Sequence, residues 1–479
     1  MKFSTRLGKM ITGLVFTVIV CSFTMQASPV KLNSNSNEIR VVQNTDLGFK
    51  VNFNFAEFKT LDIKTPKGVF TRVIVPSYSN AGQYGYPELP VKSELIEIPA
   101  NAEVRIDISS YSVREFLLKD LGINYPIMPN QPPVPKTGEI PVFIYEKGAY
   151  QVNDYGQQEI VSVEQLGEMR GVRIGRLDIM PVQYNPVTGT IRVYENIQFR
   201  VVFENADLAA TELKKEVYGN HYFQPVFNSL LNYREPENGS RENFSRYPVK
   251  YVIVSDPMFE SALQPFIEWK TKKGFIVVEA YTDDPNVGTT TSQIKAFLQG
   301  LYNTGTPEDP APTFVLFVGD IAQVPTFTGQ AAGHVTDLYY CEYTGDYFPE
   351  VFYGRFSAQN LNQLVPQVEK SLMYEQYTMP VTSYLDTVVM IAGMDGTFGP
   401  THGNGQINYG TENYFNEAHG LYSHTYLYPV SGSNAAQIRQ NISDGVTFAN
   451  YTAHGSPDGW ADPSFSVSDI SSLQNNGKY

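Results

Sequence analysis

One short segment near the end of the 479-residue chain carries the residue types of a general base. There an apolar run, Phe448–Tyr451, leads through two further residues into His454 and Gly455. A histidine at the end of a strand can reach a nucleophile and take its proton. A glycine beside it lets a substrate carbonyl approach the backbone N–H, as an oxyanion hole requires. A hydrogen-bonded structural histidine would give the same pattern, so both interpretations stay open on this segment alone.

Carboxylates in the middle of the chain have the chemistry of a hard-cation site. Asp320, Asp346 and Glu350 supply the oxygen ligands that Ca²⁺ prefers, together with backbone carbonyls. They are widely spaced along the sequence, and an ordinary solvated surface explains such acids equally well.

Thiol and zinc chemistry have little support within the sequence. Cys21 and Cys341 are its two cysteines, and Cys21 lies in a segment that we expect to be removed, so no internal disulfide is expected. Cys341 is interpreted as a small buried hydrophobe. No His-x-x-x-His or Cys-x-x-Cys spacing occurs, which argues against catalytic zinc, and no glycine-rich phosphate loop occurs.

The first residues have the order of a secretory signal. Lys2, Arg6 and Lys9 precede an apolar run, Met10–Thr24, and the small pair Ala27–Ser28 follows. The apolar run is shorter than the roughly 20 residues of a membrane span. We therefore predict a signal peptide over residues 1–27 and a secreted, extracellular or cell-surface protein.

Composition limits the class of the remainder. The chain is 42% hydrophobic, which is typical of a globular protein, and its length predicts two or three domains. Its net charge is −14 and no polybasic run interrupts it, so neither nucleic acid nor an anionic membrane is expected as a partner.

Hydrophobic periodicity divides the rest of the chain. Residues 28–204 show period-two alternation, as in Ile197, Phe199, Val201 and Phe203, with turn residues between short runs, which predicts an all-β sandwich. Residues 205–246 are predicted to be a polar linker. Its end carries Arg234, Arg241 and Arg246, and exposed linkers are where proteases cut.

From residue 247 onward, strands and helices alternate, which predicts a mainly parallel sheet with crossover helices. Functional residues of such folds collect beyond the carboxyl ends of the strands, so Asp320, Asp395 and the residues after Tyr451 are the candidates. The predicted strands are 251–255, 275–278, 314–318, 388–392 and 448–451, and the predicted helices are 259–273, 294–302 and 361–377.

Several long strings resemble the gingipains, a family of secreted bacterial cysteine endopeptidases, and most of all its lysine-specific branch. The likeness covers residues 251–479, and a weaker one reaches the propeptide through Gly85–Pro90 and Ile98–Pro99. The strings that carry it are Phe448–Ser456, Trp460–Pro463, Asp337–Tyr340, Gly345–Glu350 and Ile391–Gly393.

The resemblance implies a zymogen with a caspase-like α/β catalytic domain. Its parts would be a signal peptide (1–27), a β-rich propeptide (28–204), a linker with processing sites (205–246) and two α/β subdomains (247–380 and 381–479).

The resemblance also implies roles for single residues. His454 matches the catalytic histidine and Asp395 the acid that orients it, and Gly455 would supply the oxyanion N–H. The family's nucleophile is a cysteine downstream of the histidine, but no cysteine follows His454 here. We therefore expect the chain to end before the nucleophile and to be inactive alone. Asn475–Tyr479 is interpreted as the start of a further strand.

A calcium site is implied in the same way. Asp320, Asp346, the carbonyl of Phe348 and Glu350 match its ligands, while Thr344 stands where the lysine-specific branch has another aspartate.

Specificity for lysine is expected from the resemblance as well. The loop after the orienting acid carries neutral residues, among them Gln406 and Asn408, where arginine-selective relatives have an acid.

Expected partners are peptide and protein substrates, the chain's own propeptide as inhibitor, and the secretion machinery. Two alternatives remain: a sortase-like peptidase of type IX secretion, and a catalytically inactive binding protein or adhesin, which the missing cysteine would favour.

Overall fold

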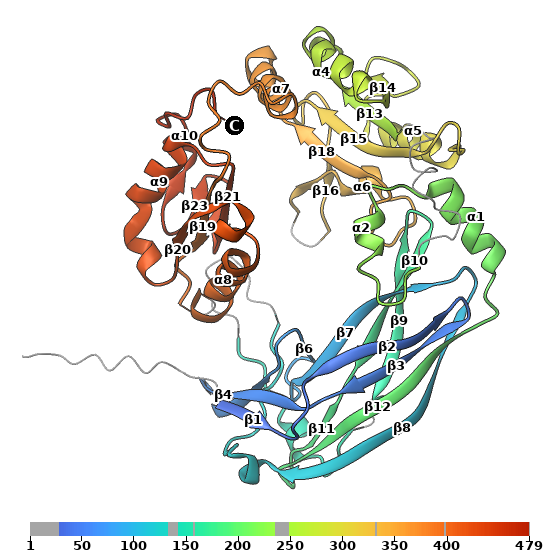
Figure 1. The fold of residues 1–479 in the computed structure, drawn as a ribbon, viewed down its shortest axis with the longest axis vertical. Helices are drawn as coiled ribbons and strands as arrows, with labels where there is room; N and C mark the ends of the chain where they lie inside the picture. Colours follow the sequence, from blue (N-terminus) through green and yellow to red (C-terminus); the bar gives the residue numbers. More distant parts are fainter. Residues whose placement is uncertain are drawn as a thin grey trace, which may run out of the picture.

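The computed structural model describes residues 28–132, 142–156, 159–234, 249–330, 333–396 and 399–478. The predicted signal peptide and two predicted cleavage sites, Arg241 and Arg246, lie outside these residues. Figure 1 shows an antiparallel part (residues 28–204), a first α/β part (249–380) and a second α/β part (381–478). Within the described residues, no helix is long and apolar enough to span a membrane.

The antiparallel part confirms the prediction of an all-β region. Its strands are β1 (Ser28–Lys31), β2 (Glu38–Thr45), β3 (Gly48–Asn54), β4 (Glu57–Thr65), β5 (Gly68–Ile74), β6 (Ser79–Ala81), β7 (Leu89–Ile98), β8 (Glu103–Leu117), β9 (Val161–Met169), β10 (Val172–Ile179), β11 (Val182–Asn185) and β12 (Thr190–Glu204). They form three sheets, ordered β1-β4-β5, β6-β7-β10-β9 and β11-β12-β3-β2, and β8 also pairs with β12.

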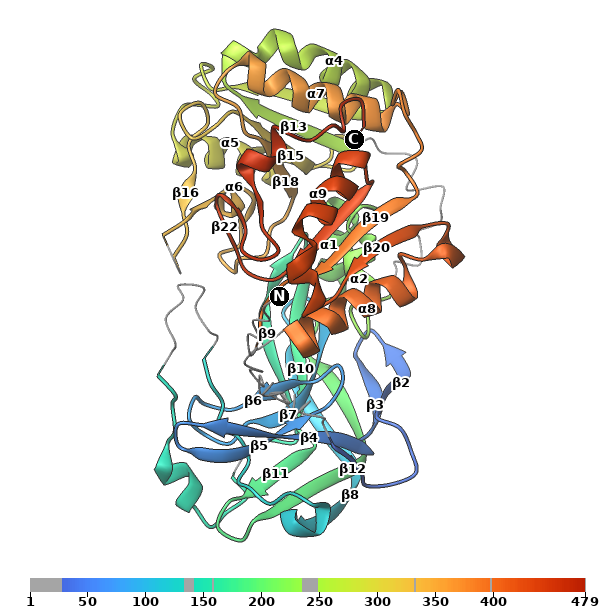
Figure 2. The same ribbon diagram turned by 90° about the vertical axis from the view of Figure 1, so that its left-hand side faces the viewer.

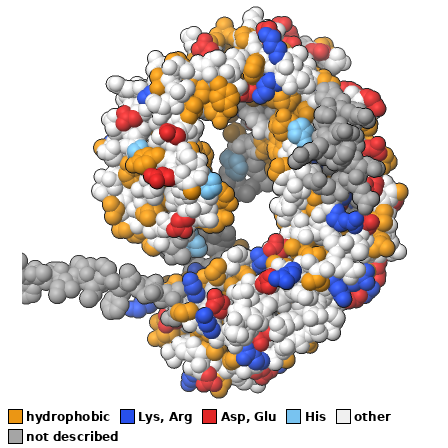
Figure 3. Space-filling model, in the orientation of Figure 1, with side chains coloured by type: hydrophobic (Ala, Val, Ile, Leu, Met, Phe, Trp, Pro, Cys, Tyr) orange, Lys and Arg blue, Asp and Glu red, His pale blue; other side chains and the backbone are white. Residues whose placement is uncertain are grey.

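One hydrophobic core joins these sheets. Along β12, Ile197, Phe199, Val201 and Phe203 are buried and the residues between them are less buried or exposed, as the alternation predicts. Each such side chain contributes about 1.5–3 kcal/mol by leaving water. Figure 3 shows acidic and basic side chains interspersed over this part of the visible face.

The segment predicted as a linker is structured over its first part, so that prediction is wrong up to residue 234. It forms α1 (Leu208–Tyr218), capped by the side chain of Asp207, and α2 (Gln224–Phe227). Phe223, Phe227 and Leu230 are buried in a cluster with β10. The helix α2 has only four residues, too few for a periodic pattern to stand out, but the combined burial of these side chains orders the segment.

The first α/β part contains a parallel sheet with the order β14-β13-β15-β18. Apolar residues on the two faces of its strands meet different helices: α4 and α7 cover one face, and α5 and α6 the other. Figure 2 shows α4 and α7 side by side. The elements are β13 (Val249–Ser255), α4 (Glu260–Lys272), β14 (Phe275–Tyr281), α5 (Thr291–Asn303), β15 (Pro312–Val318), β16 (Phe327–Thr328), β17 (Val335–Thr336), α6 (Leu338–Cys341), β18 (Phe352–Phe356) and α7 (Leu361–Glu375).

The second α/β part has a smaller parallel sheet, β20-β19-β21. Alternate residues of the central strand face α8 on one side and α9 on the other, so this strand is buried throughout most of its length. The elements are β19 (Thr387–Ala392), α8 (Asn404–Asn413), β20 (Tyr422–Tyr426), α9 (Ala435–Asp444), β21 (Phe448–Thr452), β22 (Gly455–Ser456), β23 (Gly459–Trp460), β24 (Phe465–Ser466) and α10 (Val467–Ile470).

Two features of the α/β parts differ from the expectation. β18 and β20 were not predicted, because neither has the continuous apolar run of a central strand. Residues 471–478 form turns, so the strand expected from Asn475 onward is absent from the described residues.

Candidate active site

Two neighbouring parallel strands bring the predicted catalytic residues together. In β19 and β21, Ile391 pairs with Tyr451 and Ala392 with Thr452, so both strands end at the same edge of the sheet. Asp395 follows β19 and His454 follows β21. The backbone N–H of Gly393 donates to the carbonyl of Thr452 at 3.0 Å and holds the two strand ends together.

The side chains of Asp395 and His454 are in contact. His454 Nε2 lies 2.8 Å from Asp395 Oδ2. The carboxylate keeps a proton on Nε2 and leaves Nδ1 as the basic nitrogen of the neutral ring. The side chain of Asp395 is 14% exposed, whereas that of His454 is 47% exposed. Asp395 therefore orients the imidazole ring through Nε2, and the ring remains accessible to a reaction partner.

A small hairpin sheet fixes the backbone of His454. Its carbonyl accepts hydrogen bonds from the hydroxyl of Tyr451 at 2.7 Å and from the N–H of Ala461 at 2.9 Å. The rings of Tyr451 and Trp460 stack with centroids 4.5 Å apart. Sequence reasoning missed these supports, because only the paired strands β22, β23 and β24 bring Trp460 back to β21.

Gly393 lies very close to Ala453 and Asp462, which flank the catalytic histidine. A Cβ added there would lie 2.6 Å from the Cβ of Ala453 and 2.7 Å from the carbonyl oxygen of Asp462. Real Cβ atoms do not come so near to backbone, so a side chain at residue 393 would push the β19 end away from the histidine segment.

Gly455, the predicted oxyanion donor, begins β22 and is exposed beside the histidine. Cys341 is fully buried at the end of α6, and burial raises the pKa of its thiol well above its usual range. Because thiolate is the nucleophilic form, Cys341 is unsuited to attack. His419 pairs with Asn416, and His424 contacts Tyr422.

The predicted calcium ligands separate into two places. Asp320 follows the carboxyl end of β15, and its N–H bonds to the carbonyl of Ala358. Glu350 precedes the amino end of β18 and Ala358 follows its carboxyl end, so the whole strand, which rises about 3.3 Å per residue, separates them. Asp320 thus lies at the carboxyl ends of the strands and Glu350 at the amino ends, so these residues do not converge on one ion as the prediction required.

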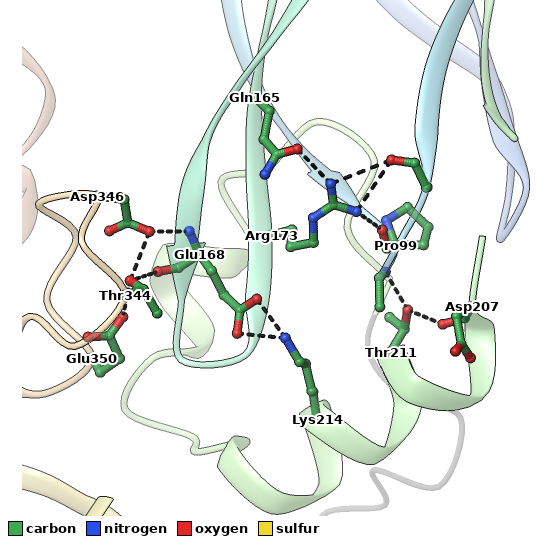
Figure 4. Close-up of polar contacts among 12 residues, drawn as sticks. Pro99, Gln165, Glu168, Arg173, Asp207, Thr211, Lys214, Thr344, Asp346 and Glu350 are labelled. Carbon is green, nitrogen blue, oxygen red and sulfur yellow. Dashed lines mark hydrogen bonds and ion pairs between the residues drawn. The ribbon is translucent and has the colours of Figure 1, made fainter. Parts of the chain in front are cut away.

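Asp346 and Glu350 do converge. The hydroxyl of Thr344 lies 2.9 Å from Asp346 Oδ2, 3.2 Å from Glu350 Oε1 and 3.4 Å from the carbonyl of Glu168 (Figure 4). One hydroxyl proton serves three acceptor oxygens there. Burial raises the pKa of Glu350 to about 7. Such an oxygen set suits a hard cation, although across the described residues no three His, Cys, Asp or Glu side chains form a metal-binding group.

Two family models match the chain: the propeptide of family C25 over residues 29–228, and peptidase family C25 over residues 245–479. Lys-gingipain of Porphyromonas gingivalis is 36% identical over 457 residues, which is 95% of this chain and 26% of the relative. Gingipain R1 of the same organism is 26% identical over 94% of this chain and 44% of the relative. The chain thus spans about a quarter of the length of the Lys-gingipains that it matches.

Solved structures give the same relatives. One, described as structural insight into zymogenic latency of gingipain K from Porphyromonas gingivalis, has 32% identity, covers 37% of this chain and 99% of its own, and has a TM-score of 0.35. Another, described as a protease, has 41% identity, covers 48% of this chain and 51% of its own, and has a TM-score of 0.45.

Proposed function

Because this chain belongs to peptidase family C25, the gingipain family, we propose that it acts in a cysteine endopeptidase made as a zymogen. The observation that carries the proposal is the contact between His454 and Asp395 at the carboxyl ends of two adjacent parallel strands. That edge of an open α/β sheet is where catalytic groups collect.

The proposed mechanism assigns each residue a step in proton transfer. His454 takes the proton of a cysteine thiol through Nδ1 and later returns it to the leaving amine. Asp395 holds the ring and stabilises the imidazolium that forms. The N–H of Gly455 donates to the oxygen that becomes negative when the thiolate attacks the carbonyl. Cys341 is buried and unsuited to attack, so the proposed mechanism requires the thiol of another cysteine.

We further propose that residues 1–27 direct export and that the enzyme acts outside the cell. Its substrates would be proteins and peptides with lysine before the scissile bond, in line with the neutral Gln406 and Asn408 of α8. A panel of peptides that differ only in lysine or arginine at that position tests the preference.

Maturation should require cleavage within residues 234–246, at the junction of the two matched regions. Arg234 is accessible there, half exposed in an ion pair with Asp46, and Arg241 and Arg246 follow it in the sequence. We expect the full-length protein to gain activity when cut in this segment, and iodoacetamide to abolish that activity. Sequencing the amino terminus of the active form checks this. An active enzyme that begins near Ser28 would contradict the zymogen, and insensitivity to the thiol reagent would contradict the cysteine mechanism.

Calcium is proposed to bind Asp346, Glu350 and the carbonyl of Phe348, where it would link the loop before β18 to its surroundings. An ion that binds only the folded state stabilises it by about 2.7 kcal/mol at one hundred times its Kd. Chelation should therefore lower the Tm by several degrees, and Glu350→Gln should remove most of that response. Asp320→Asn is the matched control and should leave it intact. Equal chelator responses in Glu350→Gln and the unmodified protein would rule out the site.

A further inference from the structure

The tip of the β9–β10 hairpin has an unusual residue in a demanding conformation. Met169 ends β9 and Val172 begins β10, so Arg170 and Gly171 form a two-residue turn, with φ of 52° and 80°. Turns with two positive φ values favour Asn, Asp or Gly, and a larger side chain costs about 1 kcal/mol. The turn holds an arginine in spite of this cost, which directs attention to its side chain.

The side chain of Arg170 is buried completely, with 1% of its surface exposed. Its planar guanidinium lies 5.3 Å from the ring centroid of Phe223 and 5.6 Å from that of Tyr302. Its N–H groups donate to the carbonyls of Tyr218 (2.9 Å), Glu350 (3.1 Å), Ala311 (3.2 Å) and Pro312, and to the hydroxyl of Thr313 at 3.5 Å.

Most of this pocket belongs to the first α/β part. Ala311 and Pro312 lie at the amino end of β15, Glu350 precedes the amino end of β18, and Tyr302 lies in the last turn of α5. The pocket therefore lies at the edge of the sheet opposite to the carboxyl ends of its strands. Arg170 contacts a surface that is separate from the His454–Asp395 pair, and it does not occupy that site as a substrate side chain would.

The backbone beside Arg170 makes further contacts with the same part. The N–H of Glu168 donates to Asp346 Oδ2 of that part at 2.6 Å, whereas the side chain of Glu168 pairs with Lys214 Nζ of α1, outside the first α/β part, at 2.7 Å (Figure 4). A Cβ on Gly167 would collide with the carboxylate of Asp346. The hairpin tip thus contacts the first α/β part through the side chain of Arg170 and through the backbone of Glu168.

Burial lowers the pKa of Arg170 to about 10, so the group stays charged at neutral pH. If it were removed, the carbonyls that surround it would lose their donors in a space closed to water, and each unsatisfied buried group costs about 1–3 kcal/mol. Arg170 therefore has the features of an interface residue whose truncation is far more costly than that of its neighbours.

We propose that Arg170 anchors the propeptide (residues 28–234) to the peptidase after the chain between them is cut, and that its pocket is a guanidinium-binding site on the first α/β part. The site holds an arginine of this same chain, presented by a rigid hairpin. This contact would hold the propeptide on the peptidase independently of any group bound near His454 and Asp395.

The test uses the full-length protein with a specific cleavage sequence placed between residues 235 and 248. After cutting, gel filtration over a dilution series gives the Kd of the two fragments, and this measurement does not require peptidase activity. Arg170→Ala should raise the Kd by about 100-fold or more. Arg170→Lys, which keeps the charge but loses the planar fork, should raise it by at least about 10-fold.

Arg173→Ala is the matched control. Arg173 lies on the same hairpin, but its guanidinium contacts Pro99, Ala102 and Gln165 of the propeptide itself. The Arg173→Ala substitution should leave the Kd of the two fragments unchanged. Millimolar guanidinium, far below denaturing concentrations, should partly restore association of the Arg170→Ala fragments by filling the pocket. Equal Kd values for Arg170→Ala and the unmodified protein would overturn the proposal, and so would equal weakening by Arg173→Ala, which would point to loss of propeptide structure instead.

Discussion

Replacing His454 by Ala in the full-length enzyme is expected to lower kcat by about 1,000-fold or more. The cysteine would lose the base that makes thiolate available, and the leaving amine would lose its proton donor. Peptide hydrolysis after propeptide removal measures the effect. Binding should change little, because His454 acts on the reacting atoms, so KM is expected to stay within a few-fold of the unmodified value.

Two further variants distinguish loss of the catalytic base from loss of structure. Asp395→Asn keeps the shape of the contact but removes the negative charge, and a smaller loss is expected than for His454→Ala. His419→Ala removes a histidine of the same part that pairs with Asn416, and it should leave kcat unchanged. Full activity of His454→Ala would refute the assignment, whatever the family membership.

Gly393→Ala is expected to lower kcat by about 100-fold without touching a catalytic side chain. The added methyl group would meet Ala453 and Asp462, which flank the histidine segment, and would shift Asp395 relative to His454. A displacement of about 1 Å at a catalytic contact is enough for a loss of this size.

Gly396→Ala is the control for Gly393. It lies in the same loop, one residue beyond Asp395, but a Cβ there meets only the hydroxyl of Tyr428, at 3.8 Å. Its activity should match that of the unmodified enzyme. Comparable losses in the two variants would mean that the loop tolerates no alanine at all, and the close approach at Gly393 would not be the cause.

The elements that could be predicted are those whose pattern is local. Val388–Ala392 and Phe448–Tyr451 are apolar runs of strand length, and both are strands in the structure. Because parallel strands end at one edge, the sequence pattern pointed to Asp395 and to the residues after Tyr451, and the resemblance to the gingipains paired Asp395 with His454. β20 was not predicted because the sequence of Tyr422–Tyr426 is polar. These residues form a strand because they pair with β19.

Contacts between distant segments could not be predicted. The calcium prediction grouped Asp320 with Asp346 and Glu350 through the resemblance to the gingipains, yet the parallel sheet places Asp320 at one edge and the other two at the opposite edge. Likewise, nothing near Arg170 in the sequence marks it as buried. Three of its acceptors are backbone carbonyls more than a hundred residues away, and a backbone carbonyl cannot be recognised from the type of residue that carries it.

Because Trp460 stacks on Tyr451 beside His454, its fluorescence reports on the structure around the catalytic histidine. The chain has two tryptophans, and the other, Trp269, lies on α4 and donates to Glu375 in the first α/β part. With Trp269 replaced by phenylalanine, emission from this chain would come from Trp460 alone. A nearby tyrosine ring and the β22–β23 turn define its environment, so detachment of the histidine hairpin from β21 would change the spectrum. Stopped-flow emission could then follow the assembly of the His454 segment in real time, before any substrate is added.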